Sequence, residues 1–213
     1  EGLHQSFKCP QGILYHKYIS DIAQRKFLQK DFLKTASSTS EHIQGLWNQV
    51  DAGNICETLS SLDFNLQLPD EFLCMTDRFS MKWSVEARTP FLDNEFRSFV
   101  SHLPVAFRFQ KSPYKKLLRD VASRYLPPEY FGVPKTGFTF PVNQLMREYL
   151  RDKIDYLFSP SYLSAQSIFK PVHVANFAKR YIEGSHNKTN QMWTLLMFQL
   201  WWERQRQFGC VSL

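Results

Sequence analysis

Apolar residues recur at helical spacing along most of the chain, and the alternation typical of strands is nearly absent. The clearest case is "PYKKLLRDVASRYLPP", in which Leu117, Leu118, Val121 and Leu126 share one stripe and charged residues occupy the rest. Pro127 ends this pattern because proline cannot continue a helix. The chain is therefore predicted to be mainly α.

Local signals place several helix ends. Pro69 suits the first turn of a helix, Asp93 can cap the start of another, and Gly184 should stop a helix over residues 171–183. The last helix, residues 190–207, is apolar on nearly every side up to Trp202. We expect it to be central in the fold, or to mark where another part of a longer protein packs.

The length allows one large domain or two small ones, since 213 residues with 43% apolar content can fill a core. A Ser/Thr-rich linker is expected near residues 35–40, in "TASSTSEH". We divide the chain into a helical segment over residues 1–66 and a second helical part over residues 67–213.

Composition excludes several classes of protein. No apolar run approaches the roughly 20 residues that cross a bilayer, and the first residues do not resemble a secretory signal. The four cysteines form no C-x-x-C pair, which favours reduced thiols in a cytoplasmic protein. The net charge of +6 is scattered, so nucleic-acid binding is a weak hypothesis.

One polar cluster lies in "DRFSMKWSVEARTPFLD", where charged and large apolar residues are mixed without a helical period. A buried charge is costly unless it is paired, so these side chains reach water, pair with each other, or line a site. For Glu86 and Arg88 we favour an internal ion-pair network that locks one helix to the next. For Asp77 and Arg78 both interpretations stay open.

A second cluster is basic. Lys115, Lys116 and Arg119 lie on one predicted helix, and Lys135 follows in the Gly/Pro-rich segment "FGVPKTGFTFP", which we expect to be an ordered loop. Basic groups held in this way could clamp a phosphate chain and stabilise charge that develops on it.

Together the two clusters resemble the asparagine synthetase-like family. "LPDEFLCMTDRFSMKWSVEARTPFLD" follows that family's L-P-D-x-x-L-x-x-x-D-R-x-S-M-x-x-S-x-E-A-R-x-P-F-L-D pattern. "KKLLRDVASRYLPPEYFGVPKTGFTFP" is similar to its K-x-L-L-R, L-P and P-K-x-G-F-x-x-P elements, in the same order. The resemblance covers residues 68–141.

The resemblance implies the helical C-terminal portion of an α/β adenine nucleotide α-hydrolase-like (ATP pyrophosphatase) synthetase domain. Such enzymes use ATP and Mg2+ to adenylate a carboxylate, usually that of aspartate, and ammonia from glutamine then displaces AMP. Carried over by motif, Lys135 would be the catalytic lysine that offsets charge on departing pyrophosphate. Lys115 would be a second phosphate contact, and Asp77 and Arg78 would help to bind the nucleotide.

The chain also departs from the family pattern. Val133 stands where the family often has arginine, and the nucleotide loops S-G-G-x-D-S and S-G-x-G-x-D-E do not occur. The chain also does not begin with Met. We therefore expect a C-terminal fragment, inactive alone, whose partners are upstream synthetase and glutaminase domains that hold most of the ATP and Mg2+ contacts. No metal ligands are assigned within this chain, and a homodimer is left open.

Two alternatives remain. The same scaffold could act on another substrate in lactam, peptide or sugar amidation. Alternatively, the chain could be a non-catalytic helical binding module that keeps the family's packing motif. The residue at position 133 favours the second alternative, whereas the presence of Lys115, Lys135 and Gly137 together argues against it.

Overall fold

The computed structural model describes residues 21–36, 38–50, 54–110, 114–132, 136–137, 140–185 and 188–209. These residues form helices and turns without any strand, and an isolated antiparallel bridge joins Leu28 to Phe169. The mainly α prediction is confirmed. No helix in these ranges is long and apolar enough to cross a membrane.

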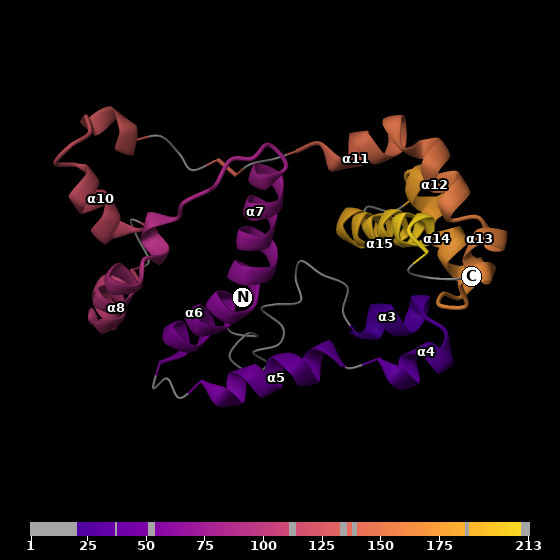
Figure 1. Cartoon of the computed structure of the whole chain (residues 1–213), viewed down its shortest axis with the longest axis horizontal. Helices are drawn as coiled ribbons and strands as arrows, with labels where there is room; N and C mark the ends of the chain where they lie inside the picture. The colour runs from indigo at the N-terminus through magenta and orange to yellow at the C-terminus, as the bar shows by residue number, and fades with distance from the viewer. Residues whose placement is uncertain are drawn as a thin grey trace. The chain divides into compact units, whose positions relative to one another are not determined.

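The chain divides into two compact units (Figure 1). Unit 1 comprises residues 1–44 and 138–213, and unit 2 comprises residues 45–137. The Ser/Thr-rich stretch includes the end of helix α4 (Lys30–Thr35) and the start of helix α5 (Thr39–Gln49), and its role as a linker stays a prediction. The proposed division at residue 66 stays a prediction.

Unit 1 is built from helices at both ends of the chain. They are α3 (Asp21–Phe27), α4 (Lys30–Thr35), the start of α5 (Thr39–Gln49), α11 (Val142–Gln144), the π-helix η4 (Leu145–Tyr149), α12 (Arg151–Leu157), α13 (Pro160–Gln166), α14 (Pro171–Ile182) and α15 (Thr189–Gln207).

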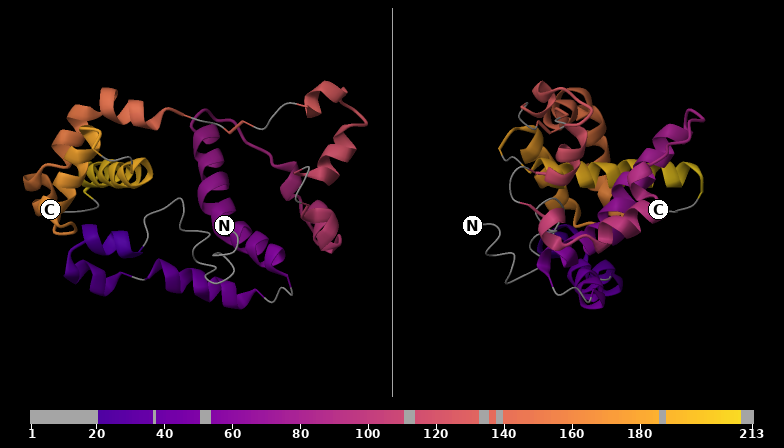
Figure 2. Two further views of the ribbon diagram at one scale, coloured as in Figure 1. Left: turned by 180° about the vertical axis from the view of Figure 1, so that it is seen from behind. Right: turned by 90° about the vertical axis from the view of Figure 1, so that its left-hand side faces the viewer.

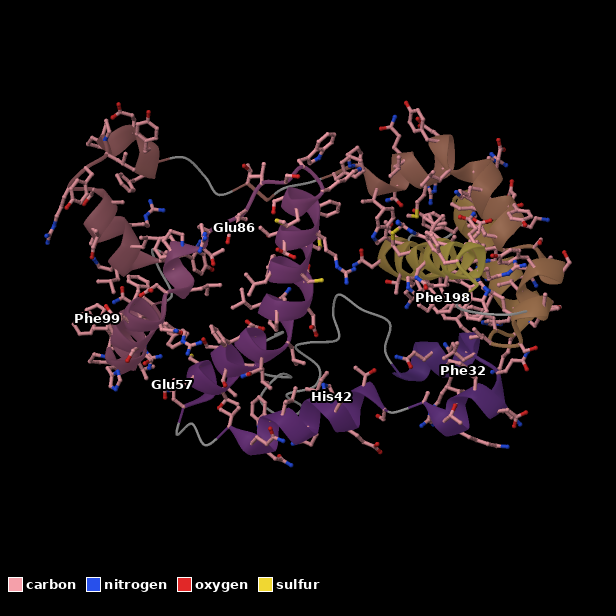
Figure 3. The ribbon with its side chains drawn as sticks, in the orientation of Figure 1. Phe32, His42, Glu57, Glu86, Phe99 and Phe198 are labelled. Atoms are coloured by element: carbon pink, nitrogen blue, oxygen red, sulfur yellow. The ribbon has the colours of Figure 1, made fainter. Side chains whose placement is uncertain are left out.

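The core of unit 1 forms around α15, which contacts α11, α12 and α14 (Figures 1 and 2). Met192, Leu195 and Leu196 on α15 are buried among apolar side chains of those helices. Figure 3 shows Phe198 within the same crowded set of side chains. The expectation that this helix is central is confirmed, and its buried face is covered from within unit 1.

A polar pair lies inside this core. Gln166 on α13 and Gln199 on α15 are 5% and 0% exposed, and each amide donates to the other's oxygen at 2.7 and 2.9 Å. A buried amide is costly when unpaired, so this reciprocal pair favours one alignment of α13 against α15.

Local signals in unit 1 acted as predicted, with one omission. Gly184 ends α14 at φ +80°, where Ser185 N–H donates to the Arg180 carbonyl and Gly184 N–H to that of Tyr181. Residues 142–157 form three successive short elements, α11, η4 and α12. Helix α13 was missed because its seven residues are too few to show a period.

Unit 2 carries both motif clusters. Its elements are the end of α5, α6 (Ile55–Asn65), the π-helix η1 (Leu68–Leu73), α7 (Cys74–Met81), the 3-10 turn η2 (Pro90–Leu92), α8 (Asn94–His102), α9 (Val105–Arg108), α10 (Lys116–Ala122) and the 3-10 turn η3 (Pro128–Phe131).

Unit 2 has almost no buried core. Among its described residues only Thr58 and Leu62 are buried. Charged groups make some of the contacts between its helices: Arg108 of α9 pairs with Glu57 of α6, and the Arg97 guanidinium lies 5.0 Å from the Phe64 ring centre. Such contacts hold helices together without removing much apolar surface from water.

The apolar stripes of unit 2 are consequently exposed. Phe72, Met75 and Phe79 follow one face of η1 and α7 and are 54%, 51% and 65% exposed. Leu118 and its neighbours on α10 form the amphipathic stripe seen in the sequence, and they are exposed too. Figure 3 shows the side chain of Phe99 on α8, which is exposed in the same way. Large exposed apolar patches are typical of surfaces where another polypeptide packs.

Candidate active site

The first motif block starts with the helical pair η1 and α7. Pro69 lies in the first turn of η1 as predicted, with Asp70 and Glu71 beside it near the positive end of the helix. The π-helical geometry of η1 is rare and is found frequently at functional sites.

Asp77 and Arg78 lie in α7, and both side chains are exposed. In the described part of the chain, neither forms a hydrogen bond or ion pair with Lys115. Their part in binding the nucleotide stays a prediction.

The end of α7 is closed by a serine in a left-handed conformation. Ser84 has φ +56°; its N–H donates to the Met81 carbonyl, and Val85 N–H donates to the Ser80 carbonyl. Gly184 closes α14 with the same hydrogen-bond pattern. A side chain makes the left-handed conformation less favourable, so Ser84 strains the turn that leads into Glu86 and Arg88.

Replacing Ser84 with glycine should raise the free energy of unfolding by about 1 kcal/mol, because glycine adopts positive φ without a side-chain penalty. Urea unfolding of the chain measures the change. The control is Ser123→Gly: Ser123 follows α10 with φ −63°, so glycine should bring no gain there. A loss of stability in Ser84→Gly would contradict this account of the turn.

Glu86 and Arg88 form an ion pair at 2.8 Å, but their side chains are 66% and 80% exposed. The expectation of an internal network that locks two helices is wrong, since both residues lie on the extended segment after α7 and face water (Figure 3). An exposed pair adds little stability. Asp93 caps α8 as predicted, accepting from the N–H groups of Glu95 and Phe96 at 3.0 Å each.

Lys115 stands immediately before α10 in the left-handed conformation, with φ +57° and ψ +38°. Non-glycine residues rarely adopt this conformation, and such strain concentrates at functional sites. Its side chain is exposed. Lys115, a candidate phosphate contact, therefore has a strained backbone conformation that the start of a helix does not require.

Arg119 on α10 is directed to the turn that precedes the Lys135 segment. Its Nη2 donates to the Phe131 carbonyl, and its guanidinium lies 5.6 Å from the Phe131 ring centre. We expected Arg119 to belong to a basic phosphate clamp, and the structure shows it engaged with η3 instead. The sequence showed Arg119 as the last residue of the K-x-L-L-R element, but it did not show that Phe131 would be its partner.

Lys135 and Val133 lie outside the described residues. Gly132, just before these residues, follows η3. At Gly137, after them, a side-chain Cβ would meet no atom within 4 Å. The role of Lys135 therefore stays a prediction.

A polar hub in unit 1 was not foreseen. Asn143 Oδ1 accepts hydrogen bonds from Tyr181 Oη and, at 2.7 Å, from Thr189 Oγ1. The Arg147 guanidinium lies 4.8 Å from the Tyr181 ring centre. Burial raises the pKa of Tyr181 above its ordinary value, against the opposing effects of Thr189 and Arg147. Asn143 comes two residues after Pro141, and no motif marks it.

The described residues were also compared with the requirements of a metal centre. No three His, Cys, Asp or Glu side chains gather to hold an ion in the described ranges. A surface hollow lined by Lys30, Lys170 and His173 belongs to unit 1, whereas the motif residues belong to unit 2.

Comparison with known proteins identifies the family. The asparagine synthase family model matches residues 12–203. A protein of Mycobacterium tuberculosis, provisionally named a glutamine-hydrolysing asparagine synthetase, is 26% identical over 144 residues, which are 67% of this chain and 22% of that protein. A Mycobacterium bovis protein matches equally, and the glutamine-hydrolysing asparagine synthetase 1 of Bacillus subtilis is 24% identical over 140 residues, 66% of this chain and 22% of its own length.

The chain thus spans about a fifth of the length of these relatives. No solved structure matched it. The family model covers most of the chain, including both motif clusters. The chain belongs to the asparagine synthase family.

Proposed function

We propose that this chain is the helical C-terminal part of an ATP-dependent carbon–nitrogen ligase. The reaction joins a carboxylate, aspartate in the first instance, to ammonia released from glutamine. A carboxylate oxygen attacks the α-phosphorus of ATP, pyrophosphate leaves, and ammonia then attacks the acyl carbon and displaces AMP. The observation that carries this proposal is the family match across residues 12–203, within which the block from Asp77 to Asp93 follows the family pattern.

Two lysines have roles in this proposal. Departing pyrophosphate carries dense negative charge, and a positioned cation stabilises that charge as it forms. We assign this role to Lys135 and a second phosphate contact to Lys115. The strained backbone of Lys115 supports its assignment, because strain of this kind is retained where function needs it. Asp77 and Arg78, exposed on α7, are proposed to contribute to the nucleotide site.

The exposed apolar stripes of unit 2 support a larger assembly. We propose that the faces formed by Phe72, Met75 and Phe79, and by Leu118 and its neighbours, pack against the nucleotide-binding part of the same enzyme. That part would supply the phosphate loop and the Mg2+ ligands, with a glutaminase domain beyond it. Cys56 and Cys74 are free thiols, which fits the cytoplasm.

The test is carboxylate-dependent exchange of labelled pyrophosphate into ATP, measured on a complete asparagine synthase protein that contains this chain. Exchange with aspartate, and none when the carboxylate is omitted, is the expected result. Exchange only with another carboxylate, such as a β-amino acid or a peptide terminus, would replace aspartate while keeping the chemistry. Absence of exchange with every carboxylate, although ATP binds, would refute the ligase in favour of a binding module.

A further inference from the structure

The start of α4 is held against the start of α14 in unit 1, although 140 residues separate Gln29 from Phe169. Gln29 makes two of the contacts: its backbone N–H donates to the Ile168 carbonyl at 2.8 Å, and its side-chain amide donates to the Phe169 carbonyl at 3.0 Å. The Lys170 N–H donates to the Phe27 carbonyl at 2.7 Å. These hydrogen bonds fix the two helix starts relative to each other.

A surface hollow of about 530 Å³ is lined by residues from both helix starts. The residues that line it are Gln29, Lys30, Lys170, Pro171, Val172, His173 and Asn176. This volume is within the range of sites that bind small molecules, roughly 300–1,000 Å³. In the described part of the chain, the lining contains two lysines and no carboxylate.

The positive charge at the hollow is not balanced by an acid. In the described ranges, no ion pair joins Lys30 or Lys170 to a carboxylate. Asp31, which follows Lys30 in the chain, pairs with Lys34 instead. The Lys170 ammonium donates to the Arg25 carbonyl at 2.7 Å, and because an ammonium has three N–H groups, two remain for other acceptors. Two such cations beside a hollow favour an anionic ligand.

The hollow also has an apolar wall. The His173 ring centre lies 5.9 Å from that of Phe27, a buried residue, so the imidazole is restrained from one side. Val172, beside it, is 68% exposed. Binding sites for small molecules combine apolar surface with a few charged or polar groups in this way. A ligand with both a charged and an apolar part fits the hollow better than a bare anion does.

We propose that this hollow binds a small phosphate-bearing molecule with a planar or apolar part, the chemistry of a mononucleotide. The ammonium groups of Lys30 and Lys170 contact the phosphate, and Val172 and His173 contact the rest of the molecule. None of these residues belongs to the two motif clusters, so the proposal does not depend on the proposed ligase reaction.

The test is calorimetric titration of the 213-residue chain at low salt with AMP, inorganic phosphate and sulfate as probes. The chain lacks the S-G-G-x-D-S nucleotide loop, so binding to that loop does not contribute. The variants are Lys30→Met and Val172→Ser, both at exposed positions where neither change should unfold the chain. The control is Lys179→Met, which removes a charge from α14 and breaks only the exposed pair with Glu183.

We expect AMP to bind at least about fivefold more tightly than phosphate, because only AMP covers the apolar wall. Lys30→Met should weaken the binding of both probes about tenfold, the usual effect of losing one hydrogen bond to a charged group. Val172→Ser should weaken AMP about threefold and leave phosphate within about twofold of wild type. Lys179→Met should stay within about twofold of wild type for both probes.

Three results would overturn the proposal. Equal binding of AMP, phosphate and sulfate, weakened alike by Lys30→Met and Lys179→Met, would show only a general attraction of anions to a basic chain. AMP binding that survives the combined Lys30→Met and Val172→Ser changes would place the nucleotide elsewhere in the chain. Absence of AMP binding at millimolar concentration would rule out the site while leaving the ligase function untouched.

Discussion

Replacing Lys135 with alanine should lower pyrophosphate exchange by the complete enzyme about 100- to 1000-fold, the usual effect of removing one positioned group that stabilises transition-state charge. Ammonia-dependent formation of product should fall by a similar factor, because both depend on the adenylate. The KM for ATP should change much less, since the charge that Lys135 is proposed to offset develops as pyrophosphate leaves.

Two variants make this prediction specific. Lys135→Arg keeps the charge but replaces a compact ammonium by a larger planar group, so it should not restore full activity. Lys153, exposed on α12 of unit 1, provides a matched control, and Lys153→Ala should exchange at the wild-type rate. Wild-type exchange in Lys135→Ala would disprove the assignment, whereas equal losses in Lys135→Ala and Lys153→Ala would point to an unspecific effect of charge.

Truncating Leu196 to alanine should lower the free energy of unfolding of the chain by about 2–5 kcal/mol, the range found for leucine side chains removed from a packed core. Leu196 is 0% exposed on α15, the helix around which unit 1 is built. Urea unfolding followed by tryptophan fluorescence measures the loss, since Trp193, Trp201 and Trp202 lie on the same helix.

The matched variant is Leu118→Ala on α10, where the same side chain is 46% exposed. In the chain alone it should change the unfolding free energy by no more than about 0.5 kcal/mol. In the complete synthetase the loss should approach that of a core leucine, because we propose that this face is covered there. An equally large loss in the chain alone would show that unit 2 has a core of its own.

The sequence predicted best what depends on neighbours along the chain. Pro69 at a first turn, Asp93 as a cap and Gly184 as a stop each follow from dihedral preferences and hydrogen bonds within a few residues. The family resemblance could also be found from the sequence, because the order and spacing of motifs are set by the chain itself and do not depend on how it folds.

The sequence was least informative about which apolar stripes are covered. The stripe on α10 and the apolar residues of α15 look equally suited to burial, yet in the described residues only those of α15 are covered by other helices of their own unit. Covering a face takes residues far away in the sequence, and helical periodicity carries no information about them.

The same distinction separates the candidate residues. The sequence alone favoured an internal ion-pair network for Glu86 and Arg88, and it suggested that Arg119 belongs to a phosphate clamp. In the tertiary structure the first two pair in water and Arg119 binds Phe131. Residue type and spacing were enough to predict the mainly α class, several helix ends and the family, because those depend on local backbone geometry and motif order. Which charges meet, which faces are covered and which turn an arginine holds were decided only by folding, because those depend on distances between residues that the chain order does not specify.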